Sequence, residues 1–478
     1  MGIRENKFFV ALPYIYPVCP LSIDHGRMFV IADILGRNAK MLGKELVFKV
    51  ATHYSGNTAH KVATSFERYF SQNGQAEESD ERIFNLYKDK YGTPVSDLQE
   101  FSNPIKILDY YSQAIIEELK LLRVSCDYDD FYDTKNDLFS KFVNYILQKY
   151  EQDGVIIKNN QGEISLNYNN KSWRAFASEL LERTEFIQPQ YKEVIRSAMT
   201  NVRDDWNLLR TDGYGVKYKD SKIIDPMFDS ELFTIFDLFI NFCHKESKNK
   251  DINLLFDHLF NSLRQDSESQ EESINKILNF LPCDVFVCEE HLKNWVAKRM
   301  FAESYFLHSK YQTKRYFITG MGLLKGQRMS ASKGRAILVK DLIRDHGPFK
   351  TRLLMLLTGG HPSKIYNYDY KLIGEIETLL NNFSTHVAKL NIIIEKKDDN
   401  HDNLQIFPIE LNAKIEDINK YIEKGYFRQA IIEIISIIPK NYKNPDYHTA
   451  VSLLSLYNKY LEILIPGFLE ALTGKIIL

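Results

Sequence analysis

Two short stretches of the chain combine residue types that suit phosphate chemistry. Residues 20–27 read PLSIDHGR, which places His25 where the pattern predicts the start of a helix. Backbone N–H groups at a helix start favour anions, and an imidazole there can donate a hydrogen bond to a phosphate oxygen. Taken alone, the stretch is equally compatible with a helix capped by Asp24.

The second stretch, residues 328–335, reads RMSASKGR. Arg328, Lys333 and Arg335 surround two serines whose hydroxyl and backbone N–H groups can also donate, and phosphoryl oxygens need this density of donors. Taken alone, it could equally be an exposed turn. Neither stretch matches the glycine-rich loop of P-loop proteins or the dinucleotide-binding fingerprint.

The elements around the first stretch predict a βαβ unit. KFFVALPYIYP (residues 7–17) begins as a buried strand and is halted by its two prolines, and ELVFKVA (residues 45–51) is a second apolar strand. Between them, residues 25–42 have apolar side chains at helical spacing and stop at Gly43. Such units build parallel sheets whose ligands lie beyond the carboxyl ends of the strands.

The rest of the chain adds strands near the second stretch and many helices. CDVFVC (residues 283–288) predicts a buried strand, and YFITGMGLL (residues 316–324) leads from strand character into the RMSASKGR loop. Residues 80–205 are predicted to be mostly helical, with a small hairpin formed by VIIKN and ISLNYN. The polar residues 244–273 indicate a solvated helix and loop, and 396–403 indicate a mobile loop.

Bulk properties exclude several classes of protein. Lys+Arg 61 against Asp+Glu 63 gives a net charge of −2, which argues against a surface that attracts nucleic acid everywhere. No window approaches the roughly 18 apolar residues of a membrane span. The cysteines form no CxxC pair, so reduced thiols, a cytoplasmic location and no bound zinc are expected. They are Cys19, Cys126, Cys243, Cys283 and Cys288.

Taken together and in this order, the two stretches resemble the signatures of class I aminoacyl-tRNA synthetases, and most closely those of the archaeal and eukaryotic type of leucyl-tRNA synthetase. In that family Leu-His-x-Gly-His-x-Arg opens the first helix, where LSIDHGR stands here, and KMSKSKGN corresponds to RMSASKGR. KVATHYSGNTAHKVATSFERY (residues 49–69) resembles the family segment Phe-His-x-Thr-Gly-Thr-Pro-Ile. The resemblance covers about residues 7–365.

The resemblance implies an α/β fold: a Rossmann-like catalytic domain with a parallel sheet, a helical insertion and a C-terminal α-helical bundle. The family's editing domain is expected to be absent, because only some forty residues stand in its place. The implied ranges are 1–80 for the first half of the catalytic domain, 81–205 for the helical insertion, 206–365 for the second half with the KMSKS-like loop, and 366–478 for a truncated anticodon-binding bundle.

The resemblance also implies that ATP, accompanied by Mg²⁺, activates an amino acid, with leucine as the first guess. The amino acid is then transferred to tRNA or to a smaller acceptor such as a small molecule or carrier protein.

For His53 a structural cap on a strand stays an alternative, as does a polar helix start for Glu290 and His291. By this resemblance the catalytic residues are Ser22, His25, Arg328 and Lys333, the ATP contacts are Asp24, Arg27, Glu290, His291, Ser330, Ala331, Ser332, Gly334 and Arg335, and the amino-acid contacts are Pro13, Tyr14, His53 and Gly56.

Three positions depart from the family pattern. Ser22 stands where the family has its first histidine, Asp24 replaces the glycine against which the family places the adenine, and Ala331 replaces a lysine of the second signature. Losing one preorganised donor costs about 3 to 4 kcal/mol of transition-state stabilisation. The sequence therefore leaves three hypotheses open: an adenylating ligase with impaired ATP binding, a catalytically inactive pseudo-synthetase that binds or regulates, and a structural partner of a true synthetase.

Overall fold

A computed structural model describes the chain at residues 6–71, 77–160, 162–203, 206–218, 222–237, 240, 251–265, 272–329, 334–396 and 409–473. The chain divides into two compact units that interleave along the sequence. Unit 1 comprises Met1–Pro20, Gly43–Glu117 and Cys126–Ile318, and unit 2 comprises Leu21–Leu42, Glu118–Ser125 and Thr319–Leu478.

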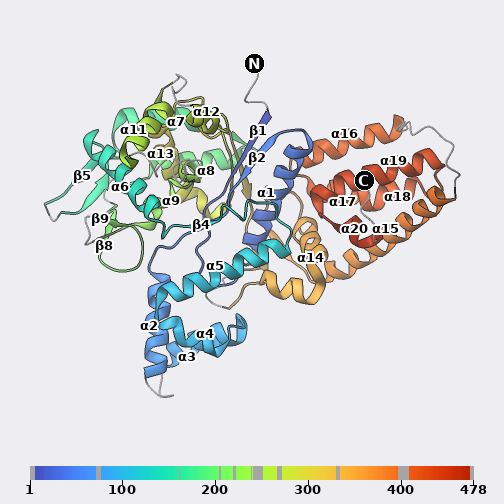
Figure 1. The fold of residues 1–478 in the computed structure, drawn as a ribbon, viewed down its shortest axis with the longest axis horizontal. Coiled ribbons are helices and arrows are strands. Elements are labelled where there is room, and N and C mark those ends of the chain that lie inside the picture. The colour runs from blue at the N-terminus through green and yellow to red at the C-terminus, as the bar shows by residue number, and fades with distance from the viewer. Residues whose placement is uncertain are drawn as a thin grey trace. The chain divides into compact units, whose positions relative to one another are not determined.

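Unit 1 is built on a five-stranded sheet, and Figure 1 shows β1 and β2 running side by side in it. The pairs β2–β1, β1–β11 and β12–β7 are all parallel, which confirms the predicted parallel sheet. Every residue of β11 is buried, as expected for a strand inside an α/β fold. In spatial order the strands are β2 (Glu45–Phe48), β1 (Lys7–Ala11), β11 (Asp284–Cys288), β12 (Arg315–Thr319) and β7 (Glu185–Phe186).

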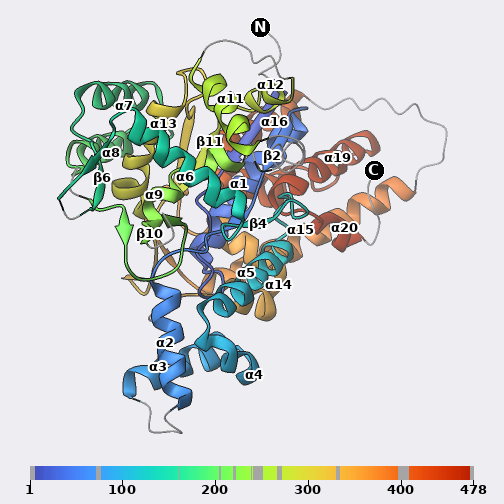
Figure 2. The same ribbon diagram turned by 60° about the vertical axis from the view of Figure 1, so that its left-hand side comes forward.

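Helices make up most of the rest of unit 1, as predicted for residues 80–205. Figure 2 shows α2 (Thr58–Ser71), α3 (Glu78–Asn85) and α4 (Val95–Leu98) grouped together, with α5 (Pro104–Leu121) next along the chain. Phe66 of α2 anchors this group through edge contacts with Phe84 and Phe101. The other helices are α6 (Asp137–Gln152), α7 (Lys171–Arg183), α8 (Gln190–Thr200), α9 (Pro226–Ser230), α12 (Glu272–Leu278) and α13 (Ala297–Phe306).

Two local predictions in unit 1 have different outcomes. β5 (Ile156–Lys158) and β6 (Ile164–Leu166) pair antiparallel, which confirms the small hairpin. Within the polar segment 244–273, α11 (Ile252–Arg264) is a helix, but Leu255, Phe256 and Leu259 on one of its faces are buried in the core. The interpretation of this part as solvated is wrong. Its apolar residues recur at helical spacing, so they form one face of α11, and that face packs into the core. Residues 244–250 and 266–271 lie outside the described residues.

Unit 2 has α1 (Ile23–Met41) at its centre. α1 is buried along most of its length, including Asp33, whose carboxylate accepts a hydrogen bond from Arg352 of α14 (Val339–Leu357) at 2.5 Å. α14 is kinked at Gly347, where φ is 77° and Pro348 follows. A small sheet with the order β14 (Gln327–Arg328), β13 (Gly322–Leu324) and β15 (Tyr366–Tyr368) completes the core of the unit.

The C-terminal part of unit 2 is helical, as the sequence predicts. α15 (Lys371–Glu395) packs against α19 (Tyr447–Leu464), and both can be followed in Figure 2. Residues 397–403 of the predicted mobile loop lie outside the described residues. Among the described helices, none has a segment long and apolar enough for a bilayer. The remaining helices are α16 (Ile409–Glu423), α17 (Phe427–Ile432), α18 (Ile438–Asn441) and α20 (Phe468–Thr473).

Candidate functional site

Ser22 is the N-cap of α1. Its Oγ accepts a hydrogen bond from the backbone N–H of His25 at 3.5 Å and lies 3.1 Å from His25 Nδ1. α1 therefore begins at Ile23, two residues before the predicted start, and the interpretation of Asp24 as the cap is wrong. A serine at this position satisfies an N–H group of the first turn, which the family's histidine would not do in the same way.

The start of α1 is hydrogen-bonded to the segment that follows the RMSASKGR stretch. Ile23 N–H donates to the Ile337 carbonyl and Val339 N–H donates to the Leu21 carbonyl, both at 2.9 Å. Ser22 and Leu338 form an antiparallel bridge between these bonds. Unit 2 thus brings the first signature next to the segment that directly follows the second signature.

The structure describes residues 328–329 and 334–335 of the second signature. Arg328 is exposed on β14, Gly334 has a φ of 66°, and Arg335 is exposed. Residues 330–333 lie outside the described residues, so the predicted contacts of Ser330, Ala331, Ser332 and Lys333 stay predictions. We call Ser22, Asp24, His25, Arg328 and Arg335 of unit 2 the signature cluster.

Asp24 is held by a buried tyrosine of β15. Its Oδ1 accepts a hydrogen bond from the Tyr366 hydroxyl at 2.5 Å. The carboxylate also lies directly against β13, because a Cβ added to Gly322 would be 2.2 Å from Asp24 Oδ1. Burial raises the pKa of Tyr366, which keeps its hydroxyl protonated and able to donate. Asp24 therefore fills space beside β13 and places negative charge there.

Arg27, which the resemblance assigns to ATP, lies inside unit 2 with an exposed fraction of 1%. Its guanidinium is 3.7 Å from the centre of the Tyr366 ring, and Nη2 donates to the Thr358 carbonyl at 3.2 Å. Among the described residues, Nε and Nη1 have no hydrogen-bond partner. The contacts of Arg27 in the structure are therefore internal, and its contact with ATP stays a prediction.

In unit 1, Tyr14 follows β1 and reaches a buried carboxylate. Its hydroxyl donates to Asp237 Oδ1 at 2.7 Å, and its ring stacks on Phe233 with 3.7 Å between centroids. The Tyr132 hydroxyl donates to the same Asp237 oxygen at 2.7 Å. Burial raises the pKa of Asp237 to about 7, although the bond from Tyr14 opposes the rise.

His53 follows the short strand β3 (Ala51–Thr52) and is paired with Asp229 of α9. Its Nε2 lies 2.9 Å from Asp229 Oδ1, and its ring meets Phe233 edge-on at 5.0 Å. Burial raises the pKa of Asp229, and the neighbouring His53 opposes the rise. We call Tyr14, His53, Phe233, Asp229 and Asp237 of unit 1 the pocket cluster.

Gly56 and Pro13 are near His53 and Tyr14 in the sequence but are not part of the pocket cluster. Gly56 has a φ of 94°, and its N–H donates to the Tyr214 carbonyl at 2.7 Å in an antiparallel bridge. The close backbone approach inferred for this glycine is therefore made, in the structure, by the segment around Tyr214. Pro13 is half-buried just after β1.

Glu290 and His291 lie in a short 3₁₀ turn (Glu289–His291) at the carboxyl end of β11. Because β1 and β11 are parallel neighbours, this turn and Tyr14 lie at the same edge of the sheet. His291 Nδ1 accepts a hydrogen bond from the Cys288 N–H at 3.2 Å, which is the polar helix start that the sequence left as the alternative. A contact of either residue with ATP stays a prediction.

Sequence reasoning missed the carboxylates of the pocket cluster. Asp229 and Asp237 recur eight residues apart within the apolar run of residues 223–240, and the structure ends α9 at Ser230, between them. An apolar segment with acids on its buried face predicts a functional or paired site. That spacing was the available signal. Among the described residues, no group of His, Cys, Asp and Glu side chains is arranged to hold a metal ion.

Comparisons with known proteins find partial sequence similarity to leucine–tRNA ligases. Residues of this chain are 26% identical to leucine–tRNA ligase 1 of Saccharolobus solfataricus over 157 residues, which is 33% of this chain and 16% of that protein. Leucine–tRNA ligase of Archaeoglobus fulgidus is 27% identical over 155 residues, covering 32% and 16% of the two chains. The chain thus matches about a sixth of the length of these relatives. No profile of a known protein family matches it.

A solved structure extends the likeness to the whole fold. Mycobacterium tuberculosis methionyl-tRNA synthetase, in complex with methionyl-adenylate, superposes with a TM-score of 0.67 at 12% identity, covering 98% of this chain and 93% of the other. The chain is therefore similar to class I aminoacyl-tRNA synthetases in about a third of its sequence and in its fold. Its Rossmann-like sheet and C-terminal helices correspond to the fold of that synthetase.

Proposed function

We propose that this synthetase-like chain is a ligase that activates an amino acid with ATP and transfers it to tRNA or to a smaller acceptor. In this proposal His25, Arg328, Lys333 and Arg335 donate to the triphosphate, with Mg²⁺ neutralising part of its charge. The carboxylate of the amino acid attacks the α-phosphorus, and pyrophosphate leaves. The chemistry is charge stabilisation and positioning, with no covalent intermediate on the protein.

One observation carries the proposal more than any other. The backbone hydrogen bonds of Ile23 and Val339 fix the start of α1 against the segment after the second signature. Two donor-rich stretches that are far apart in the sequence are thereby held in one unit, as binding a single polyphosphate requires. The methionyl-adenylate in the structurally similar synthetase supports the same class of reaction.

Asp24 favours a second candidate, a pseudo-synthetase that binds an amino acid without adenylating it. Its carboxylate lies against Gly322 and is bonded to Tyr366, in the place where the family resemblance puts the adenine. A negative charge there opposes a polyphosphate at 4 to 8 Å by roughly 1 kcal/mol or more, depending on solvent access. The proposed enzyme therefore has weak ATP binding.

The proposed amino-acid contacts are those of the pocket cluster, Pro13 and Gly56. Leucine is the first candidate because of the resemblance, but His53 and the buried carboxylates of Asp229 and Asp237 also suit a substrate with hydrogen-bond donors. With a net charge of −2, the chain offers little general attraction for whole tRNA. We therefore include small amines and carrier proteins among the acceptors, in a cytoplasmic setting and without an editing domain.

ATP–pyrophosphate exchange across a panel of aliphatic and polar amino acids tests the proposal. We expect exchange with one or a few amino acids, weakened by at least tenfold in Arg328→Ala because a cation facing the triphosphate is lost. Lys276→Met, an exposed lysine paired with Glu272 on α12, is the matched control and should behave like the wild type. Amino-acid binding without any exchange would replace the ligase by the pseudo-synthetase.

A triple variant tests whether the altered signature limits activity. Ser22→His, Asp24→Gly and Ala331→Lys together restore two donors and remove the intruding carboxylate. We expect the Kd for ATP, measured by calorimetry, to fall by at least tenfold. An unchanged Kd would show that these positions do not limit ATP binding.

A further inference from the structure

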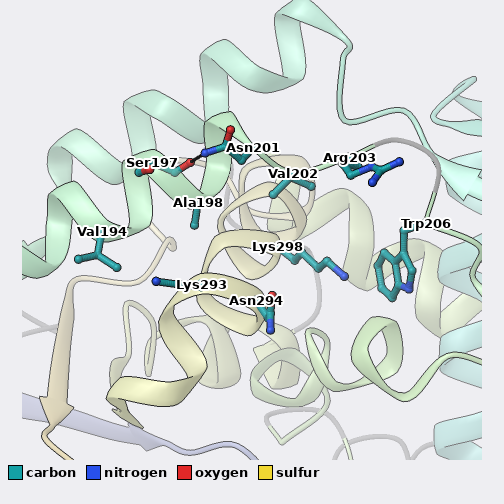
Figure 3. Close-up of a pocket in the computed structure, with 10 residues that line it drawn as sticks. All are labelled: Val194, Ser197, Ala198, Asn201, Val202, Arg203, Trp206, Lys293, Asn294 and Lys298. Carbon is teal, nitrogen blue, oxygen red and sulfur yellow. Dashed lines mark hydrogen bonds between the residues drawn. The ribbon is translucent and has the colours of Figure 1, made fainter.

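Unit 1 contains a groove that neither the signature cluster nor the pocket cluster uses. Its volume is about 640 Å³, within the range typical of small-molecule sites. Figure 3 shows it between α8 with the residues that follow it and the turn Leu292–Val296 with the start of α13. It is lined by Val194, Ser197, Ala198, Asn201, Val202, Arg203, Trp206, Lys293, Asn294 and Lys298.

The described lining is cationic. Lys293 and Lys298 contribute two positive charges, and no described lining residue carries a carboxylate. Neither lysine forms an ion pair with a described residue. Burial lowers the pKa of Lys298, and the buried Glu231 and Asp225 oppose this from a distance. Asp204 and Asp205 lie outside the described residues.

Burial also raises the pKa of Glu231 well above its usual range, and the nearby Lys298 and Arg299 oppose the rise. Glu231 acts on Lys298 only from a distance, and Lys298 forms no ion pair with a described residue. A partly desolvated ammonium without an ion pair gains free energy when an anion binds beside it. The groove thus favours a negatively charged ligand for a physical reason beyond simple surface charge.

An aromatic ring lies at one end of the groove. Lys298 Nζ is 3.0 Å from the centre of the Trp206 ring. Figure 3 shows Lys298 directed toward the indole and Lys293 at the opposite end, with Asn294 between them. A half-buried indole beside cations is the combination that binds a nucleobase and its phosphate, because every base has a face that can stack.

We propose that this groove binds a phosphate-bearing ligand of nucleotide size, with its base against Trp206 beside Lys298 and its phosphate toward the opposite end, at Lys293. The site would be separate from the signature cluster and goes beyond the adenylation proposed above. The Asn201 and Asn294 side chains supply neutral polar contacts along the sugar. The small side chains of Ser197 and Ala198 leave the groove open between its two ends.

Titration with AMP, followed by tryptophan fluorescence and calorimetry, tests the proposal. The chain has three tryptophans, so a signal that disappears in Trp206→Phe reports the groove. The titration is done in the Arg328→Ala background, which suppresses binding at the signature cluster. We expect Lys293→Met and Lys298→Met each to raise the Kd by at least tenfold, and adenosine without phosphate to bind at least tenfold more weakly than AMP.

Two variants control for charge and fold. Lys298→Arg keeps the cation and should retain binding within about threefold, and Lys276→Met removes an exposed lysine outside the lining and should bind as the wild type does. An AMP Kd that is indifferent to Lys293 and Lys298 would overturn the proposal. So would binding of a single-stranded oligoribonucleotide through these residues without binding of AMP, which would make the groove a nucleic-acid surface.

These results are independent of the proposed ligase activity. Absence of pyrophosphate exchange together with AMP binding at Trp206 would contradict the proposed ligase activity and support the proposed nucleotide site. Pyrophosphate exchange in a chain whose Trp206 fluorescence does not respond to AMP would support the ligase activity and contradict the nucleotide site.

Discussion

Tyr366 connects two charged residues of the first turns of α1. Its hydroxyl donates to Asp24, and its ring lies against the guanidinium of Arg27. Charge-assisted hydrogen bonds are stronger than neutral ones, and Asp24 is a half-buried carboxylate. Asp24 is therefore a structural partner of β15 as well as a change in the signature.

At this scale we predict that Tyr366→Phe lowers the free energy of unfolding by about 1 to 3 kcal/mol. The ring remains for Arg27, but Asp24 loses the hydrogen bond from the Tyr366 hydroxyl. Asp24→Asn should couple to Tyr366→Phe by about 1 kcal/mol in a double-mutant cycle measured by urea unfolding. Strictly additive effects would show that the two side chains do not interact in solution.

At the scale of elements, the start of α1 is fixed by a carboxyl group from the end of α5. Glu118 Oε2 accepts a hydrogen bond from the Leu21 N–H at 3.0 Å. Burial raises the pKa of Glu118 to about 8, with the Leu21 bond and the nearby Lys340 opposing the rise and Asp341 adding to it. The group that holds the first signature in place therefore changes charge near neutral pH.

We predict a pH dependence from this carboxyl group. Its pKa is higher in the folded than in the unfolded chain, so the folded state binds the extra proton between pH 4.5 and 8. Its contribution to stability is complete below about pH 4.5 and is lost as the pH rises through 8. Glu118→Gln keeps the hydrogen-bond acceptor for Leu21. At pH 9 its free energy of unfolding, measured with urea, should exceed that of the wild type by on the order of 2 kcal/mol. Equal midpoints at pH 6 and pH 9 in both proteins would contradict this.

At the scale of the whole molecule, each unit draws on three separate stretches of the chain. The core of unit 2 needs α1, because the buried Arg352 donates to Asp33 and to the Leu122 carbonyl. A buried guanidinium that loses its carboxylate is strongly destabilising. The C-terminal 160 residues of the chain therefore do not contain all of the contacts of their own unit.

We predict that a fragment of residues 319–478 has helical structure but no cooperative unfolding transition, as followed by circular dichroism during heating. The same fragment with Arg352→Met should be the more stable of the two, because the uncompensated charge is gone while the side-chain length is similar. A sharp transition in the unmodified fragment would show that unit 2 folds without α1.

The sequence predicts elements better than it predicts contacts. The parallel strands, α1 and the C-terminal helices follow from apolar periodicity and from Gly43, which are local signals. The cap at Ser22 is a local feature that the sequence offers, because a serine directly before a helix is a common N-cap. The bond between Asp24 and Tyr366 joins residues 342 positions apart, which no local pattern encodes. The apolar spacing of α11 is visible in the sequence, but the polar composition around it favours a solvated segment. Asp229 and Asp237 are also visible, but the motif resemblance points to other residues.

The hydrogen bonds between the start of α1 and Ile337 to Val339 have a consequence for synthesis on the ribosome. Translation adds about 5 to 20 residues per second, so α1 emerges on the order of 15 to 60 s before the segment that secures it. During that interval its apolar faces, buried in the finished protein, are without their final neighbours. This delay lengthens the time in which the growing chain exposes apolar surface that can aggregate.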